Sequence, residues 1–312
     1  MTYGIDQAVP AGIMGDPGPV ADERDLDSRP PFRRLVGRFR RNWVAMIAFT
    51  FLVVLVFVAI FAPLVAPQNP AHIDPLAINQ GPSSAHWLGT DSLGRDILSR
   101  LIYGARVSMR VSGVVVLLAA VVALPIGLSS GYFGHSTDAV LMRIMDALFT
   151  FPPLMLALAV AALLGPGVTV ASIAIAIPFI PGYARLVRAE VLGVREEGYI
   201  EASRSIGVNS KRMLRRHVLP NVASPLIVQV AVSFGYALLA EAGLSFLGFG
   251  VQPPNASWGT MLEDAYNFFL DKPWPMIPPG LAIALTVLAF NLVGDGLRDA
   301  LGREVIKVKG KK

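Results

Sequence analysis

The chain has 312 residues, of which 54% are hydrophobic and 16% charged, and its mean hydropathy is +0.56. So much apolar surface cannot be hidden in one soluble globule, so the composition indicates a membrane protein. The net charge of +5 does not indicate nucleic-acid binding, because the basic residues flank apolar segments instead of sharing one face with aromatic residues. The absence of cysteine excludes disulfides and thiolate metal sites. The four histidines are too far apart to suggest a metal site.

The N-terminal region, residues 1–42, is expected to be a cytoplasmic tail. Its first 30 residues are rich in Gly, Pro and Asp and poor in apolar residues, which predicts disorder. Residues 31–41 then alternate arginines with Phe32, Leu35, Val36 and Phe39. This pattern is typical of a short amphipathic helix on the inner membrane surface. It is equally compatible with a positively charged flank that has no structure of its own.

Six segments are apolar enough to cross a bilayer, which takes about 20 residues. The first is uncharged and is expected to be a retained anchor, because 42 residues precede it and the apolar run is too long for a signal peptide. The third contains Pro152-Pro153, which predicts a kink or a new helix start. The fourth is short and should continue as helix past Arg185. The six segments are residues 43–66, 107–130, 147–164, 168–182, 222–247 and 276–293.

The basic residues are distributed asymmetrically between the two sides. With the N-terminus inside, 22 lie in inner segments, whereas the outer loops carry only Arg95, Arg100 and Lys272. The positive-inside rule therefore predicts a multi-pass protein of the plasma (inner) membrane with both termini cytoplasmic. The expected organisation is an external loop at 67–105, a five-span core at 106–297 and a basic cytoplasmic tail at 298–312.

A polar island, EASRSIGVNSKRMLRRHVLP, occupies residues 201–220 between the fourth and fifth spans and should face the cytoplasm. Gly207 predicts a helix end, since glycine accepts the left-handed conformation found there. Asn209 or Ser210 can cap a second short helix that ends before Pro220. We therefore expect two short helices joined by a turn.

The island could bind either a soluble partner or lipid headgroups. The small residues Ala202 and Ser203 allow close approach, and Glu201, Arg212 and Arg216 offer charged contacts. The same basic residues would also suit anionic headgroups. These residues alone do not separate the two readings.

The order Glu-Ala-Ser, then Gly six residues after the Glu, then Leu-Pro resembles the EAA loop of permease subunits of ATP-binding cassette (ABC) importers. The resemblance implies an all-α membrane protein with the type I ABC importer permease fold. Six transmembrane helices would carry a coupling helix between the fourth and fifth, which docks on an ATPase. Ser203 departs from the family's usual Ala. The expected ATPase-coupling residues are Glu201, Ala202, Ser203, Gly207, Arg212, Arg216, Leu219 and Pro220.

Three further blocks, residues 86–108, 244–262 and 291–301, resemble the C-type permeases of the dipeptide, oligopeptide and nickel family. This resemblance implies a lipid-embedded complex with a second, B-type permease subunit, one or two cytoplasmic ABC ATPases and an extracytoplasmic substrate-binding protein. The chain has no phosphate-binding P-loop sequence, so it is not expected to be an enzyme. No cofactor, metal ion or nucleic acid is expected in this chain, and ATP and Mg would be bound by partner subunits.

Two other groups of residues could carry function. On the outer side, Asp91, Arg95, Asp96 and Trp258 could contact the binding protein. The alternative, a folded external loop held by Asp–Arg pairs, is favoured by the turn-forming residues around them. Glu241 lies in an apolar segment, where an ionisable residue is costly. It could belong to the translocation path or have a paired structural role. No catalytic residue is identified.

The leading hypothesis is a permease subunit of an importer for dipeptides or short oligopeptides. A nickel-chelate importer of the same family is the alternative, and a haem-like cargo is a further one. An ion-coupled secondary transporter is disfavoured, because the spans carry few charges and show no convincing internal repeat. A membrane scaffold without transport activity is the third reading.

Overall fold

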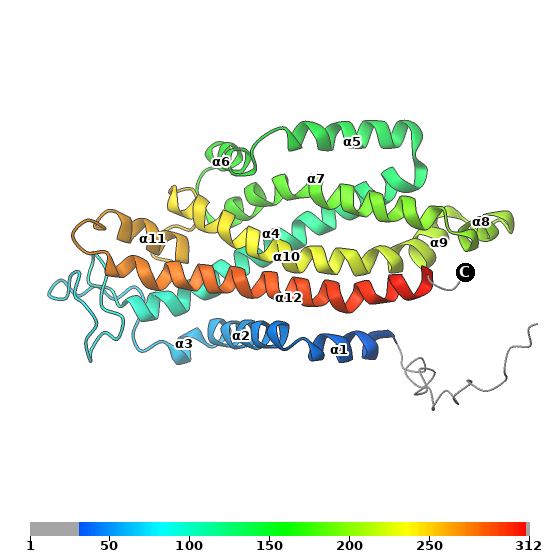
Figure 1. Cartoon of the computed structure of the whole chain (residues 1–312). Helices are drawn as coiled ribbons and strands as arrows, with labels where there is room; N and C mark the ends of the chain where they lie inside the picture. The colour runs from blue at the N-terminus through cyan, green and yellow to red at the C-terminus, as the bar shows by residue number, and fades with distance from the viewer. Residues whose placement is uncertain (1–30, 310–312) are drawn as a thin grey trace, which may run out of the picture.

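The computed structural model describes residues 31–309, so the expected disordered tail at residues 1–30 lies outside the described residues. Within them, the regular elements are helices, and one isolated bridge pairs Thr90 with Asp96. Long helices run alongside one another, with α8 and α9 at one end of the molecule and α11 at the other (Figure 1). The helices are α1 Pro31–Arg41, α2 Trp43–Ile60, α3 Ala62–Val65, α4 Ile97–Phe133, α5 His135–Phe149, α6 Pro153–Leu164, α7 Val168–Arg195, α8 Gly198–Ser205, α9 Ser210–Met213, the π-helical η1 Leu214–Val218, α10 Leu219–Phe246, α11 Trp258–Tyr266, the 3₁₀-helical η2 Trp274–Met276 and α12 Ile277–Lys309.

Five helical runs in the described residues are long and apolar enough to cross a membrane: α2, α4, α7, the run 210–246 and the run 274–301. A sixth crossing exists if α5 and α6, which meet at a bend of 89°, count as one broken span. The break lies at the predicted proline pair, because Pro152 caps α6 and Pro153 begins it. The six predicted spans therefore correspond to five unbroken helical runs and one broken pair.

The third span begins earlier than the sequence predicts. Residues 131–146 were expected to form a short loop, but they belong to the end of α4 and to most of α5. The polar residues that interrupt this stretch have partners on other helices. Asp138 accepts two hydrogen bonds from Arg188 of α7, both at 2.6 Å, and another from Ser130 of α4. These partners allow a charged segment to remain helical.

Residues 31–41 form the helix α1, which is one of the two possibilities considered for them. This helix contacts the last helix, α12. Arg38 Nη1 donates a hydrogen bond of 3.3 Å to the carbonyl oxygen of Ala300 in α12. Phe39 packs edge-on against Phe49 of α2, with 6.0 Å between ring centroids. α1 thereby joins α2 to the C-terminal part of α12.

The helices α4 and α7 approach each other closely in the core. A Cβ added at Gly127 would lie 2.6 Å from the carbonyl oxygen of Ala184, and one added at Gly131 would lie 2.7 Å from Val191. The two glycines are four residues apart and form a small-xxx-small motif, which lets two backbones approach in a membrane. Buried Val115 and Ile175 continue this contact toward the outer side. The two helices therefore form one packed unit.

We expect Gly127→Val to lower the melting temperature of the protein in detergent. The added side chain cannot fit between α4 and α7, and overpacking of this kind costs about 1–3 kcal/mol. Gly193→Val in α7 is the matched control, since nothing lies within 4 Å of a Cβ at that position. Equal melting temperatures for the two variants would contradict the close contact.

Candidate functional site

The polar segment between the fourth and fifth spans, which is predicted to face the cytoplasm, begins with α8, which ends in the turn that Gly207 predicts. Gly207 has a φ of +79°, the left-handed region that favours glycine. Its N–H donates to the carbonyl oxygen of Arg204, and the N–H of Val208 donates to that of Ser203. This pair of bonds is a Schellman motif. The predicted helix end is therefore present.

The second helix begins at the predicted cap but continues further than expected. The side chain of Asn209 accepts a hydrogen bond of 3.0 Å from the N–H of Lys211, which starts α9. The helix then widens into a π-helical turn, η1, and runs without a break into α10, whose first turn contains Pro220. The expected separate helix over residues 211–217 is therefore the first part of the fifth span.

Three buried apolar side chains fix this polar segment to the membrane helices. Ile200 of α8, Met213 of α9 and Val218 of η1 are almost fully buried, in a cluster that includes Val187 and Val191 of α7. Burying a side chain of this size stabilises the packed state by roughly 1.5–3 kcal/mol. The segment is therefore anchored on α7.

A second set of contacts joins α8 directly to the start of the fifth span. The side-chain amide of Asn221 donates to the hydroxyl of Tyr199 at 3.2 Å and to the carbonyl oxygen of His217 at 2.7 Å. The rings of Tyr199 and His217 lie 6.2 Å apart. The guanidinium of Arg204 also lies over the ring of Tyr132 in α4, 5.4 Å from its centroid. A displacement of α8 would therefore act on both α4 and α10.

The opposite side of the segment is exposed on the molecular surface and is strongly basic. A hollow with a volume of about 760 Å³ opens there. Ile206, which is not among the predicted coupling residues, is 81% exposed at its edge. The sequence signal that could have identified Ile206 is its position as an apolar residue directly before the glycine that ends the helix. The hollow is lined by Ile206, Gly207, Val208, Asn209, Lys211, Arg212, Arg215 and Arg216.

Most of the predicted coupling residues lie on this exposed side. Glu201 and Ala202 on α8, with Arg212, Arg216 and Pro220, are exposed. Ser203 and Leu219 are half-buried, and Ser203 donates to the carbonyl oxygen of Tyr199 at 2.7 Å. The structure therefore brings the predicted residues together on one continuous segment.

At the outer end, four charged side chains form a linked network. Asp91 Oδ2 accepts from Arg95 Nε at 2.7 Å and lies 3.3 Å from Arg100 Nε. Asp264 Oδ2 accepts from Arg95 Nη2 at 2.8 Å and from Arg100 Nη2 at 2.9 Å. Partial burial and the adjacent charge of Asp264 raise the pKa of Glu263. The network fastens α11 to the external loop and to α4.

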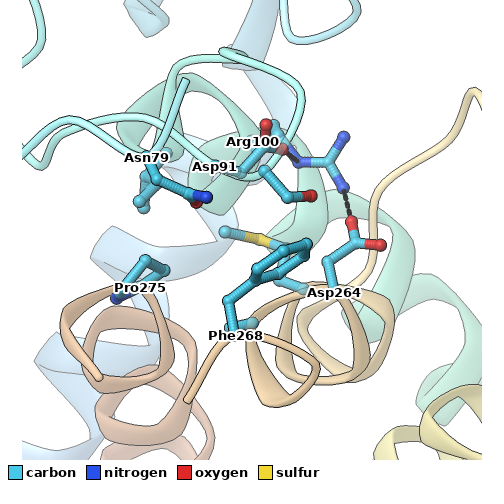
Figure 2. A pocket seen from close by; sticks show the side chains of 10 residues that line it. Asn79, Asp91, Arg100, Asp264, Phe268 and Pro275 are labelled. Carbon is cyan, nitrogen blue, oxygen red and sulfur yellow. Dashed lines mark hydrogen bonds and ion pairs between the residues drawn. The ribbon is translucent and has the colours of Figure 1, made fainter. Parts of the chain in front are cut away.

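The network borders a cavity just large enough for one water molecule. Its volume is about 10 Å³. Figure 2 shows Arg100 reaching Asp264 on one side, with Asn79, Phe268 and Pro275 on the other walls. Such a space is too small for a transported solute.

The predicted outer residues are buried within this folded cap. Asp96 caps α4 by accepting from the N–H of Ser99 at 2.8 Å and also lies 3.1 Å from His86 Nδ1. Trp258 donates from Nε1 to the carbonyl oxygen of Leu101 at 3.0 Å. Asp91 and Arg95 are likewise buried. Their contacts are those of a folded external loop held by Asp–Arg pairs.

Glu241 is 1% exposed and lies in a network of serine hydroxyls. Its two carboxylate oxygens accept from Ser108 Oγ of α4 and from Ser245 Oγ of α10, each at 2.8 Å. Each hydroxyl in turn accepts a backbone N–H, from Trp258 and from Val251. Each serine hydroxyl thus donates to the Glu241 carboxylate and accepts from a backbone N–H. The network therefore connects α4, α10 and the start of α11. Glu241 does not face an open path in this structure.

We expect Glu241→Ala to lower the melting temperature in detergent strongly. The change leaves two buried hydroxyls without an acceptor, and an unsatisfied buried group costs about 1–3 kcal/mol. Glu241→Gln keeps one acceptor oxygen and should lower the melting temperature less than Glu241→Ala does. An unchanged melting temperature with loss of uptake would contradict this structural role and return Glu241 to the translocation path.

Comparison with known proteins agrees with this geometry. The family described as binding-protein-dependent transport system inner membrane component matches residues 123–307, and the N-terminal TM domain of oligopeptide transport permease C matches residues 30–82. The chain is 41% identical to a dipeptide transport system permease protein, DppC, of Alkalihalophilus pseudofirmus, over 92% of this chain and 94% of that protein. It is 44% identical to a glutathione transport system permease protein, GsiD, of Pectobacterium atrosepticum, over 89% and 93%.

A solved structure shows the same fold. An inward-facing structure of the MetNI methionine ABC transporter aligns with 64% of this chain and 95% of its own chain, with a TM-score of 0.54 and 18% sequence identity. At this identity the likeness concerns the fold alone. It is the fold of type I ABC importer permeases.

Proposed function

We propose, from the premise that this chain belongs to the family of inner membrane components of binding-protein-dependent transport systems, that it imports dipeptides or short oligopeptides as half of a translocation path. The relatives named above support a peptide-like substrate, since one is a dipeptide permease and the other a glutathione permease. Neither is a nickel permease, so the nickel-chelate alternative loses support.

The observation that carries the mechanism is the cytoplasmic segment. α8 and the basic hollow are exposed, while Ile200, Met213 and Val218 anchor the same segment to the membrane helices. A partner that grips the exposed side would therefore move α7 and α10 with it. We assign the exposed side, Glu201 to Pro220, to docking of an ATPase subunit.

The remaining partners follow from this assignment. ATP and Mg would be bound by one or two separate ATPases, because this chain has no P-loop sequence. A second, B-type permease would complete the path, and an extracytoplasmic binding protein would deliver the substrate to the outer cap. The basic residues on the α8 side favour a cytoplasmic location for both termini in the inner membrane.

Gly207→Pro and Glu201→Lys should uncouple ATP hydrolysis from uptake while the chain still inserts into the membrane. Proline fixes φ near −65°, which is incompatible with the φ of +79° at Gly207 and breaks the Schellman turn. The charge reversal at Glu201 disturbs the exposed face of α8. Uptake and ATPase activity are measured in proteoliposomes that contain the complete importer.

The matched controls lie just outside this surface. Glu196→Lys makes the same charge reversal at the end of α7, and Gly198→Ala changes a glycine with nothing within 4 Å. Both should retain coupled uptake. Normal uptake by Gly207→Pro and Glu201→Lys would disprove the coupling assignment.

The substrate class is tested on the same proteoliposomes, together with the binding protein that co-purifies with the complex. We expect ATP-dependent uptake of dipeptides or short oligopeptides. Nickel-chelate uptake without peptide uptake would overturn the peptide assignment. Uptake that persists without the ATPases but collapses with the proton gradient would overturn the importer mechanism itself.

A further inference from the structure

An exposed ion pair joins α5 and α7 within the membrane-spanning part of the chain. Asp146 Oδ1 accepts a hydrogen bond of 2.9 Å from Arg185 Nη2, and the Arg185 guanidinium lies 4.2 Å from the ring centroid of Phe149. Although they are paired, the side chains of Asp146 and Arg185 are 62% and 39% exposed. The pair therefore needs further solvation from outside this chain.

The contact between α4 and α7 places this pair at membrane depth. Gly127 of α4 meets Ala184 and Val187 of α7, so Arg185 lies at the level of Gly127. α4 carries no charged residue over residues 111–133. This stretch is about 33 Å long at 1.5 Å per residue, enough to cross a hydrocarbon core of about 30 Å. We therefore infer that Arg185, which the charge count assigned to an inner segment, lies inside the bilayer.

Asp146 lies further from the cytoplasmic end than the neighbouring ion pair of the same two helices. Asp138 and Arg188 pair beside the last turn of α4, where Asp138 also accepts from Ser130. Asp146 follows Asp138 by eight residues on α5, which is about 12 Å along the helix axis. The two pairs thus form a charged row that extends from the cytoplasmic end into the membrane.

The exposed polar side chains around Asp146 form one stripe of α5. Arg143 and Thr150, three residues before Asp146 and four after it, are also exposed. Residues at this spacing share one helix face. The exposed surface of α2 includes Ile47 and Val54, and α2 contains no charged residue, whereas α5 exposes Arg143 and Asp146 next to the apolar Ile144.

The helix break lies directly next to this stripe. α5 ends at Phe149 and α6 begins at Pro153, with a bend of 89° and with Phe151 and Pro152 exposed between them. In Figure 1 α6 is seen nearly end on beside the axis of α5. Non-helical backbone at membrane depth is tolerated only where protein buries it or where it lines a water-filled cavity.

We propose that the stripe from Arg143 to Pro153, with Arg185 opposite Asp146, lines a water-filled part of the translocation path. Lipid would leave both the exposed charges and the broken backbone unsolvated, so two independent features exclude a lipid-facing role. Water satisfies both. Charges of each sign also suit a zwitterionic peptide in transit, which carries an ammonium and a carboxylate. This assignment rests on the proposed importer function.

The chain has no cysteine, which permits a direct accessibility test with single substitutions. Thr150→Cys places a thiol on the polar stripe, and Thr50→Cys places one on the apolar face of α2. The positions are matched, since both threonines are exposed and donate to the carbonyl oxygen four residues earlier. Each variant is assembled into the complete importer in proteoliposomes and treated with a membrane-impermeant, cationic methanethiosulfonate. Labelling of this chain is followed by mass spectrometry.

We expect Thr150→Cys to react at least about tenfold faster than Thr50→Cys, because the reactive thiolate forms poorly in an apolar environment. Transported dipeptide with ATP should slow the reaction at residue 150 and leave residue 50 unchanged. Equal, slow labelling at both positions would overturn the water-filled assignment, since lipid or the second permease would then cover the stripe. Fast labelling that is unaffected by peptide and ATP would overturn its place on the substrate's route.

Uptake is measured first on the same preparations, so that the two proposals can fail separately. Absence of ATP-dependent uptake in the unsubstituted importer would count against the proposed function. Intact uptake together with equal labelling of the two variants would count against the stripe alone.

Discussion

The close contact between α4 and α7 is the interaction on which the rest of the structure depends. Without side chains at Gly127 and Gly131, the two backbones meet directly, so neither helix can tilt without the other. The outer end of α4 carries the charged network with Asp264 and the Glu241 network, while the inner end of α7 leads into α8. One packed pair thus connects the cap formed by α11 and the 67–96 loop to the segment that begins with α8, and this continuity is what the proposed ATP-driven movement would need.

The segment from α8 to α10 packs on the helix that precedes it and on the helix that follows it. Ile200 and Met213 are buried against α7, and Asn221 bonds α8 to the start of α10. The π-helical turn Leu214–Val218 lies between Met213 and Asn221, and its Val218 is buried in the same cluster. A displacement at α8 would therefore reach α7 through apolar packing, and it would reach α10 both through Asn221 and through the π-helical turn.

Local signals in the sequence predicted local structure well. Gly207, Asn209 and Pro153 each have a short-range effect on the backbone, and each marks the helix boundary that it predicts. Hydropathy identified the six apolar segments because it, too, depends only on residues that are neighbours in the sequence. The helical character of residues 131–146 could not be predicted this way, because Asp138 is stabilised by Arg188, fifty residues further on. The distant partner of Glu241 could not be predicted either, since Ser108 lies 133 residues away.

Burial separates charged residues that look alike in the sequence. Glu241 and Asp146 both interrupt apolar helices, and an ionisable group in such a position invites a functional role. Glu241 is enclosed by hydroxyls that themselves accept hydrogen bonds from backbone N–H groups. Both oxygens of its side chain therefore have hydrogen-bond partners within the chain. Asp146 has an arginine partner but remains largely exposed beside a broken helix. A buried carboxylate whose acceptor oxygens are satisfied stabilises one arrangement of helices, whereas an exposed one within a membrane-spanning segment needs a polar partner from outside the chain. The exposure of Asp146 is therefore the observation that supports the proposed water-filled stripe.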